Sequence, residues 1–301
     1  MTALRTVLGI AALAALLPAT TRAQGDDQDF QSKLDTTLAL SANGTVELAL
    51  VSGEIHVDAG SRSDVRIHAV SERGILRLDA SPSRIALDVR SRRGDMGDTR
   101  YDVTVPTGTR LILRSVSGDI HAAGVGGEAE VHSVSGDIEI QDVSGHFTVE
   151  SVSGNVTAGR VAADVRGSTV SGDITLERVK GDVDLQSVSG DIELRDVTST
   201  FVRSETVSGD LTYEGTVSGS GRYEMHTHSG DIRLTTPGDI GALVSVETFS
   251  GDIDSAYPIT IQPGDHDVNM GRPKRFEFKV GDGSARIVLQ TFSGDITLAH
   301  R

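Results

Sequence analysis

The sequence predicts an all-β chain that forms a single-domain β-solenoid, with about 18 residues in each coil and two short strands per coil. Three observations lead to this prediction. The tripeptide Ser-Gly-Asp recurs eight times, apolar and polar residues alternate between the recurrences, and no comparable helical periodicity exists after the N-terminal segment. Alternation with a period of two is the pattern of a strand that buries one face.

The repeat has a basic step of nine residues, grouped in pairs. Its Ser-Gly-Asp glycines stand at positions 118, 136, 172, 190, 209, 230, 251 and 294, and weaker copies occupy 127, 145, 163 and 181. Counted from the glycine slot, positions +2, +4 and +7 are apolar in 26 of 27 cases between residues 120 and 197, and Gly167 is the exception. We therefore assign all three slots to the interior. The +7 slot is valine throughout, at 125, 134, 143, 152, 161, 170, 179, 188 and 197.

An apolar strand face must be covered by other apolar side chains, and two architectures are compatible with the repeat. An antiparallel meander would form one broad sheet whose apolar side lacks a cover. A coil with strands on opposite sides presses its own apolar faces together and stacks each repeat on the next as parallel strands. We favour the solenoid, in which glycine would supply the positive φ needed at sharp corners.

Composition and charge exclude several classes of protein. The absence of cysteine removes disulfides, thiolate nucleophiles and Cys-ligated metals. The net charge of −15 argues against nucleic acid and against anionic lipid, so any partner is expected to be cationic or neutral. No cofactor is implied.

The N-terminal segment predicts export. Residues 1–23 contain Arg5, an apolar run from Val7 to Leu17 and a small-residue site ending at Ala23, which is the layout of a secretory signal peptide. A polar linker is expected at 24–35 and one repeat domain at 36–299, with a regular core at 109–198 and a late loop or cap at 254–281. We expect no transmembrane anchor in the mature chain, and a periplasmic or cell-surface location.

The repeated Ser-Val-Ser-Gly-Asp-Ile units, the approach from Tyr101 to Gly108 and the closing segment from Gln290 to Ile296 resemble one known group. They are similar to the bacterial putative-adhesin family of exported β-strand-repeat domains of unknown function, which is related to the toastrack domains. This resemblance covers nearly all of the mature chain. It implies a β-helix-like repeat fold, an extracytoplasmic location, and roles in adhesion or envelope-stress sensing, and it carries no catalytic or cofactor residues to this sequence.

Metal sites were considered at two places. A corner ladder of Asp119, Asp137, Asp173 and Asp191 could bind calcium, although the Gly-Gly-x-Gly-x-Asp pattern of calcium β-rolls is absent. We favour aspartates that accept hydrogen bonds from turn amides. The pair His226 and His228, to which His266 could be added, has the spacing of strand metal ligands, but we favour solvated histidines.

Catalysis is not favoured. Serines in a repeated Ser-Gly-Asp are turn residues, and no Gly-x-Ser-x-Gly elbow exists. A basic cluster in the late loop, at Arg272, Lys274, Arg275 and Lys279, is interpreted as a solvated loop that pairs with the acidic body. The sequence therefore predicts an exported, non-enzymatic, adhesin-like or envelope-associated module with a protein or glycan ligand. The competing functions are an enzyme acting on an extracellular polysaccharide and a calcium-stiffened structural spacer.

Overall fold

The computed structural model describes residues 31–91, 97–258 and 274–301. In these ranges it contains strands and no helix, and hence no helix that could cross a membrane. The predicted signal peptide at 1–23 lies outside the described residues. Strand β1 begins at Ser32, so its first residues fall in the range predicted to be linker.

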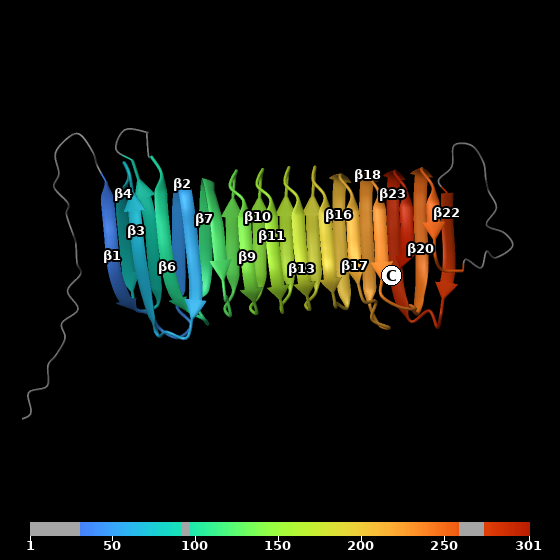
Figure 1. Cartoon of the computed structure of the whole chain (residues 1–301), viewed down its shortest axis with the longest axis horizontal. Helices are drawn as coiled ribbons and strands as arrows, with labels where there is room; N and C mark the ends of the chain where they lie inside the picture. Colours follow the sequence, from blue (N-terminus) through green and yellow to red (C-terminus); the bar gives the residue numbers. More distant parts are fainter. Residues whose placement is uncertain (1–30, 92–96, 259–273) are drawn as a thin grey trace, which may run out of the picture.

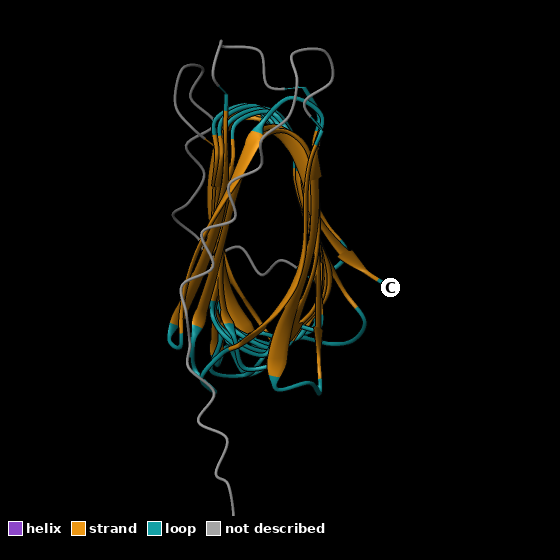
Figure 2. Ribbon diagram, turned by 90° about the vertical axis from the view of Figure 1, so that its left-hand side faces the viewer, coloured by secondary structure: helices purple, strands orange, loops and turns teal. Residues whose placement is uncertain are grey.

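The strands form a long, flattened body with two sheet layers that face each other across a narrow interior (Figures 1 and 2). We call the layers face A and face B. In spatial order, face A contains β4 (Ile75–Ser81), β5 (Arg84–Arg90), the first halves of β2 (Thr45–Gly60) and β7 (Arg110–Ala123), β8 (Ala129–Ser133), β10 (Phe147–Ser151), β12 (Val165–Thr169), β14 (Val183–Ser187), β16 (Phe201–Ser208), β18 (Arg222–Ser229), β23 (Ala285–Ser293), β20 (Ala242–Ser250) and β22 (Lys274–Val280).

Face B contains β1 (Ser32–Ala39), β3 (Asp64–Ser71), β6 (Thr99–Pro106), the second halves of β2 and β7, β9 (Ile138–Val143), β11 (Val156–Val161), β13 (Ile174–Val179), β15 (Ile192–Val197), β17 (Leu211–Gly215), β19 (Ile232–Thr236), β24 (Ile296–His300) and β21 (Ile253–Ser255). The chain passes from face A to face B at a corner that carries Ser-Gly-Asp, which we call the SGD corner. It returns to face A at the opposite corner.

Neighbouring coils pair as parallel strands in one register. Val156 lies opposite Ile138 on one side and opposite Ile174 on the other, and Ile174 lies opposite Ile192. Each partner is therefore 18 residues away along the chain. This register confirms the predicted β-solenoid and shows that the antiparallel meander was the wrong alternative for these repeats.

Both ends of the body depart from the order of the sequence. At the N-terminal end, β2 pairs with β7 on one side, and on the other side with β5 on face A and β6 on face B. After β2 the chain therefore forms an outer coil, which contains β5 and β6. It then returns to the inner side of β2 with β7, where the regular repeats begin. Strands β1 and β3 on face B and β4 on face A continue this end with antiparallel pairing. Antiparallel strands at the ends of a parallel stack cap the open edges.

At the C-terminal end, the last coil of the sequence is inserted between two earlier coils. β23 pairs with β18 and β20, and β24 pairs with β19 and β21. This insertion explains the long interval between Gly251 and Gly294, which the sequence analysis interpreted as a loop or cap. Within that interval, β22 runs antiparallel to β20 as the outermost strand of face A, and residues 259–273 lie outside the described ranges.

The interior is aliphatic in the regular repeats, and Phe147 is fully buried there as predicted. Further along, Tyr213 and Tyr223 meet edge to face with their ring centroids 5.6 Å apart. The Tyr223 hydroxyl donates to the Ser199 carbonyl at 2.7 Å and accepts from the Ser218 N–H at 2.8 Å. Burial raises the pKa of both phenols, so these tyrosines stay neutral core residues.

The +7 valine is buried at one corner and exposed at the other. This finding corrects the prediction that every +7 valine lies in the interior. At the opposite corner Val125, Val143, Val161, Val179 and Val197 are buried, as predicted. At the SGD corner the prediction is wrong, because Val134, Val152, Val170 and Val188 are 43–47% exposed.

A backbone kink explains the difference. At the opposite corner the residue before the valine has a positive φ, from 53° to 58° at Asp142, Arg160, Arg178 and Asp196 and 75° at Gly124. That kink reverses the alternation and turns the valine inward. At the SGD corner the alternation continues, so a buried Ser or Thr takes the inward slot and the valine points outward.

The glycines at the SGD corner are required by close approach in the regular coils, where the expected positive φ is absent, whereas Gly230, Gly251 and Gly294 in the later coils do have a positive φ of 153–157°. A Cβ on Gly136 would lie 2.0 Å from the carbonyl oxygen of Gly118, and one on Gly190 would lie 2.2 Å from that of Gly172. Neither glycine has a φ in the left-handed region. Coils stack so closely at this corner that no side chain larger than hydrogen fits there.

Candidate binding surface

The SGD corner is built from a short hydrogen-bonded turn. In the coil of Gly136, the buried Ser133 hydroxyl donates to the Gly136 carbonyl at 2.9 Å and accepts from the Gly136 N–H at 3.0 Å. Ser115 and Ser151 make the same pair of bonds in their own coils. In these three coils the hydroxyl satisfies backbone groups that the bend removes from the sheet ladder. In later coils the equivalent Thr227 and Thr248 donate to the glycine carbonyl of a neighbouring coil.

The aspartate after each glycine binds the next coil. The backbone N–H of Asp137 donates to Asp119 Oδ1 at 3.0 Å, and that of Asp191 donates to Asp173 Oδ1 at 2.9 Å. Asn155 takes one position in this series. The same bond continues through the irregular coils at Asp210, Asp231, Asp295 and Asp252. We call the whole row the acidic ladder.

Next to this ladder lies a row of exposed apolar side chains, which we call the apolar ridge. It consists of Val116, Val134, Val152, Val170, Val188, Val207, His228, Phe292 and Phe249, in the spatial order of their coils. Among the described residues, every exposed large hydrophobic side chain except Ile75 belongs to this ridge. The valines are 43–49% exposed. Exposed apolar side chains gathered in one strip are a common feature of interaction surfaces.

The ridge ends in a stack of three aromatic rings. The ring of His228 lies parallel to that of Phe292 with centroids 4.9 Å apart, and Phe249 stacks on the other side of Phe292 at the same spacing. His228 is thus part of the ridge. The ridge therefore changes from aliphatic to aromatic where the C-terminal coil is inserted.

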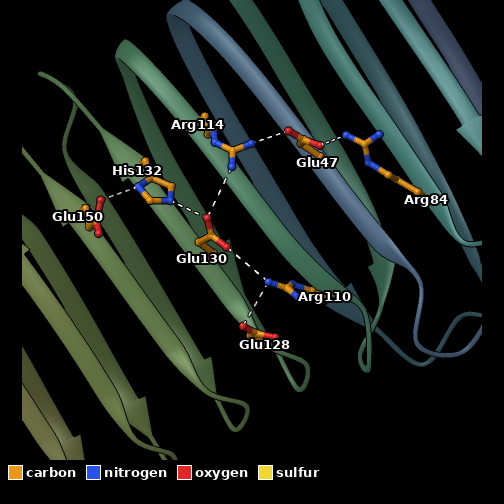
Figure 3. Close-up of polar contacts among 8 residues, drawn as sticks. All are labelled: Glu47, Arg84, Arg110, Arg114, Glu128, Glu130, His132 and Glu150. Atoms are coloured by element: carbon orange, nitrogen blue, oxygen red, sulfur yellow. Dashed lines mark hydrogen bonds and ion pairs between the residues drawn. The ribbon is translucent and has the colours of Figure 1, made fainter.

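Charged side chains on face A neutralise one another. Figure 3 shows Glu47 between Arg84 and Arg114, with Arg114 Nη1 2.5 Å from Glu47 Oε1. Glu130 accepts from His132 Nε2 at 2.8 Å and lies 3.5 Å from Arg110. Remaining contacts in the cluster join Arg114 to Glu130, Arg110 to Glu128 and His132 to Glu150.

These contacts favour the ionised carboxylates. The hydrogen bond from Arg84 holds the pKa of Glu47 below its ordinary value, and the hydrogen bond from His132 does the same for the pKa of Glu130. A general acid needs a raised pKa near the working pH. The cluster in Figure 3 is therefore suited to holding strands together and unsuited to protonating a leaving group.

The Toastrack DUF4097 family model matches residues 39–182 and 103–299, which together span nearly all of the repeat region. The chain belongs to the Toastrack DUF4097 family. A search of curated proteins found no match to this Toastrack chain.

Solved structures align with this Toastrack chain at low sequence identity. A putative lipid binding protein from Parabacteroides distasonis aligns with a TM-score of 0.51 and 12% identity, over 90% of this chain and 96% of that one. A putative adhesin from Bacteroides fragilis aligns with a TM-score of 0.43 and 12% identity, over 89% and 97% of the two chains. The first of these likenesses shows a common fold.

The Toastrack fold places the residues of the two less favoured metal-site alternatives as follows. Asp119, Asp137, Asp173 and Asp191 stack on one corner, where each offers Oδ1 to a backbone N–H. His226 and His228 point to the same side of β18, and His266 lies outside the described residues. No group of three or more His, Cys, Asp or Glu side chains suited to a metal ion occurs in the described ranges.

Sequence reasoning missed one cluster on face B. His56, His68 and Asp102 line a shallow depression of about 230 Å³ between β2, β3 and β6. The ring of His56 stacks on that of His121 at 4.8 Å. These histidines come from strands that pair out of sequence order, so no spacing in the sequence connects them.

Proposed function

We propose that this chain is an exported, non-enzymatic, adhesin-like binding module that contacts its envelope or surface ligand through the apolar ridge. The single observation that carries the proposal is the ridge itself. Nearly all exposed large hydrophobic side chains of the described residues lie in one row, on the corner where the sequence repeat is strongest. A repeat that only stacked coils would have no need of valine at an outward position.

Export is proposed from residues 1–23, whose charged, apolar and small-residue regions follow the order of a signal peptide. Glu47 and Glu130 on face A have lowered pKa values, so neither is suited to act as a general acid. The family membership and the likeness to adhesin-named structures are consistent with a binding role.

The test compares two triple variants of the purified chain in a sedimentation assay with cell envelopes of the producing bacterium. Val152→Thr, Val170→Thr and Val188→Thr keep the β-branched shape and remove apolar surface from the ridge. Thr157→Ser, Thr175→Ser and Thr212→Ser, outward on face B, are the matched control. We expect the ridge variant to lose about tenfold or more in affinity and the control to bind like the wild type. Equal binding by all three proteins would overturn the proposal.

A further inference from the structure

The apolar ridge is bordered on one side by acids that have almost no basic counterpart nearby. In the eight coils from Gly136 to Gly251, the six-residue strips around each corner glycine, such as 132–137, contain no lysine or arginine. The acidic ladder borders the ridge on the face B side. On the face A side the neighbouring row includes Glu247, and also Glu150 and Glu205, which are paired with His132 and Arg203.

The acidic ladder differs from the rest of the charged surface. On the faces, carboxylates such as Glu47 and Glu193 are paired with arginines. Of the ion pairs in the described part of the chain, only one reaches the ladder, where Lys274 Nζ lies 3.0 Å from Asp252 Oδ1 at the C-terminal end. The ladder otherwise keeps its negative charge available for a partner.

The spacing of the ridge indicates the shape of that partner. Coils in a parallel stack lie about 4.8 Å apart, so the eight steps from Val116 to Phe249 cover about 38 Å. One α-helical turn rises about 5.4 Å, whereas side chains on one face of an extended strand recur at about 6.8 Å. Apolar residues at every turn of a helix of about 25 residues would therefore follow the ridge more closely than those of a strand.

We propose that the ridge binds a cationic amphipathic helix, with apolar side chains on the valines and phenylalanines and with Lys or Arg on the acidic ladder. The inference rests on the proposed function and names the class of partner. Charge complementarity carries it, because an apolar ridge alone would accept many partners. The unpaired charge of the acidic ladder repels an anionic membrane and a second copy of the same ridge.

Asn155 provides a matched way to test the charge. It accepts the N–H of Asp173 at 3.1 Å, so an asparagine keeps the ladder bond without the charge. Asp173→Asn with Asp191→Asn removes two charges beside the ridge. Asp164→Asn with Asp182→Asn removes two charges at the opposite corner, where Asp182 N–H donates to Asp164 Oδ1 at 2.9 Å. Circular dichroism melts establish that both double variants fold.

The probe is a fluorescein-labelled helical peptide of leucine and lysine, titrated with the full chain and followed by fluorescence anisotropy. Comparison peptides replace every lysine with glutamate or every leucine with serine. We expect binding of the leucine-lysine peptide alone, a decrease of affinity with added salt, and about a fivefold loss in Asp173→Asn with Asp191→Asn. The opposite-corner variant should bind like the wild type.

Several outcomes would overturn the inference. In the peptide titration, they are equal affinity for the glutamate or serine peptide and an equal loss of affinity in both double variants. A third is stronger binding of the chain to anionic phosphatidylglycerol vesicles than to the leucine-lysine peptide. A fourth is a dimer of the chain in sedimentation equilibrium that the valine-to-threonine substitutions dissociate. The proposed function has a separate readout. If Val152→Thr, Val170→Thr and Val188→Thr abolish envelope binding while the peptide fails to bind, the function stands and the cationic partner alone is refuted.

Discussion

Asn155 accepts a hydrogen bond from the backbone N–H of Asp173 at a position where other coils use aspartate. The bond therefore depends on the side-chain oxygen and not on its charge. Aspartate predominates in the row all the same, at Asp119, Asp137, Asp173 and Asp191. The stacking role and the surface charge of the ladder are separable, and each can be tested by substitution.

Asp173→Asn should leave stability nearly unchanged, and Asp173→Ala should destabilise the chain by about 1 kcal/mol because the Asp191 N–H loses its acceptor. Urea unfolding followed by circular dichroism measures both.

Calcium should not stabilise the chain. Because Oδ1 of each ladder aspartate already accepts a hydrogen bond from the next coil, the midpoint of thermal unfolding should be the same in calcium and in chelator. A higher midpoint in calcium would instead support the calcium-stiffened spacer.

Gly190→Ala should destabilise the chain by about 1–3 kcal/mol, because the added Cβ would lie 2.2 Å from the Gly172 carbonyl oxygen. Gly238→Ala is the control, since a Cβ there meets no atom within 4 Å. Chemical denaturation of the two variants side by side measures the difference. Similar midpoints for both would show that the coils do not stack as closely as described.

Arg178→Gly should stabilise the chain by about 1 kcal/mol, because Arg178 has a φ of 54° that glycine adopts without a steric cost. The ion pair that is lost, to Glu177, is partly solvent-exposed, at 48% for Arg178 and 34% for Glu177, and contributes little. Arg166→Gly, in the middle of β12, should instead destabilise the chain by about 0.5–1 kcal/mol. If both substitutions destabilise the chain equally, Arg178 does not have the strained positive φ. The proposed cause of the inward turn of Val179 is then wrong.

Glu47→Gln should lower stability at neutral pH by about 0.5–1 kcal/mol. The pKa of Glu47 is lowered in the folded chain by Arg84, so its contribution is present above its ordinary pKa of 4.5 and disappears as the pH falls through the lowered value. The difference between variant and wild type should therefore shrink from about pH 5 to about pH 2. Glu277→Gln, exposed on β22, is the charge-matched control. A constant difference across this range would contradict the pairing in Figure 3.

The repeat alone was sufficient to predict the solenoid, its coil length and the buried +2 and +4 positions. Alternation in nine-residue steps buries its apolar face without further elements only when two such steps form one coil with opposed faces. It was not sufficient to separate the two corners. Val134 and Val143 occupy the same slot of the repeat, yet one is exposed and the other buried. The backbone of the preceding residue determines whether the valine is buried or exposed. Ser133 continues the strand alternation, whereas Asp142 interrupts it with a positive φ.

The apolar ridge and the order of the end coils were missed for different reasons. The ridge was not predicted because every regularly spaced valine was assigned to the interior. The inserted coil was hidden because strand neighbours in the irregular parts depend on contacts between segments that are far apart in sequence. Gly294 follows Gly251 in the chain, but its coil stacks between those of Gly230 and Gly251.

The most direct test of the central claim is hydroxyl-radical footprinting of the chain, free and bound to cell envelopes. The apolar ridge predicts protection that recurs once per coil, at the SGD corners 133–137, 151–155, 169–173 and 187–191. The opposite corners, such as 142–146 and 160–164, should react alike in both states. Protection of the opposite corners or of either sheet face, without protection of the ridge, would contradict the account.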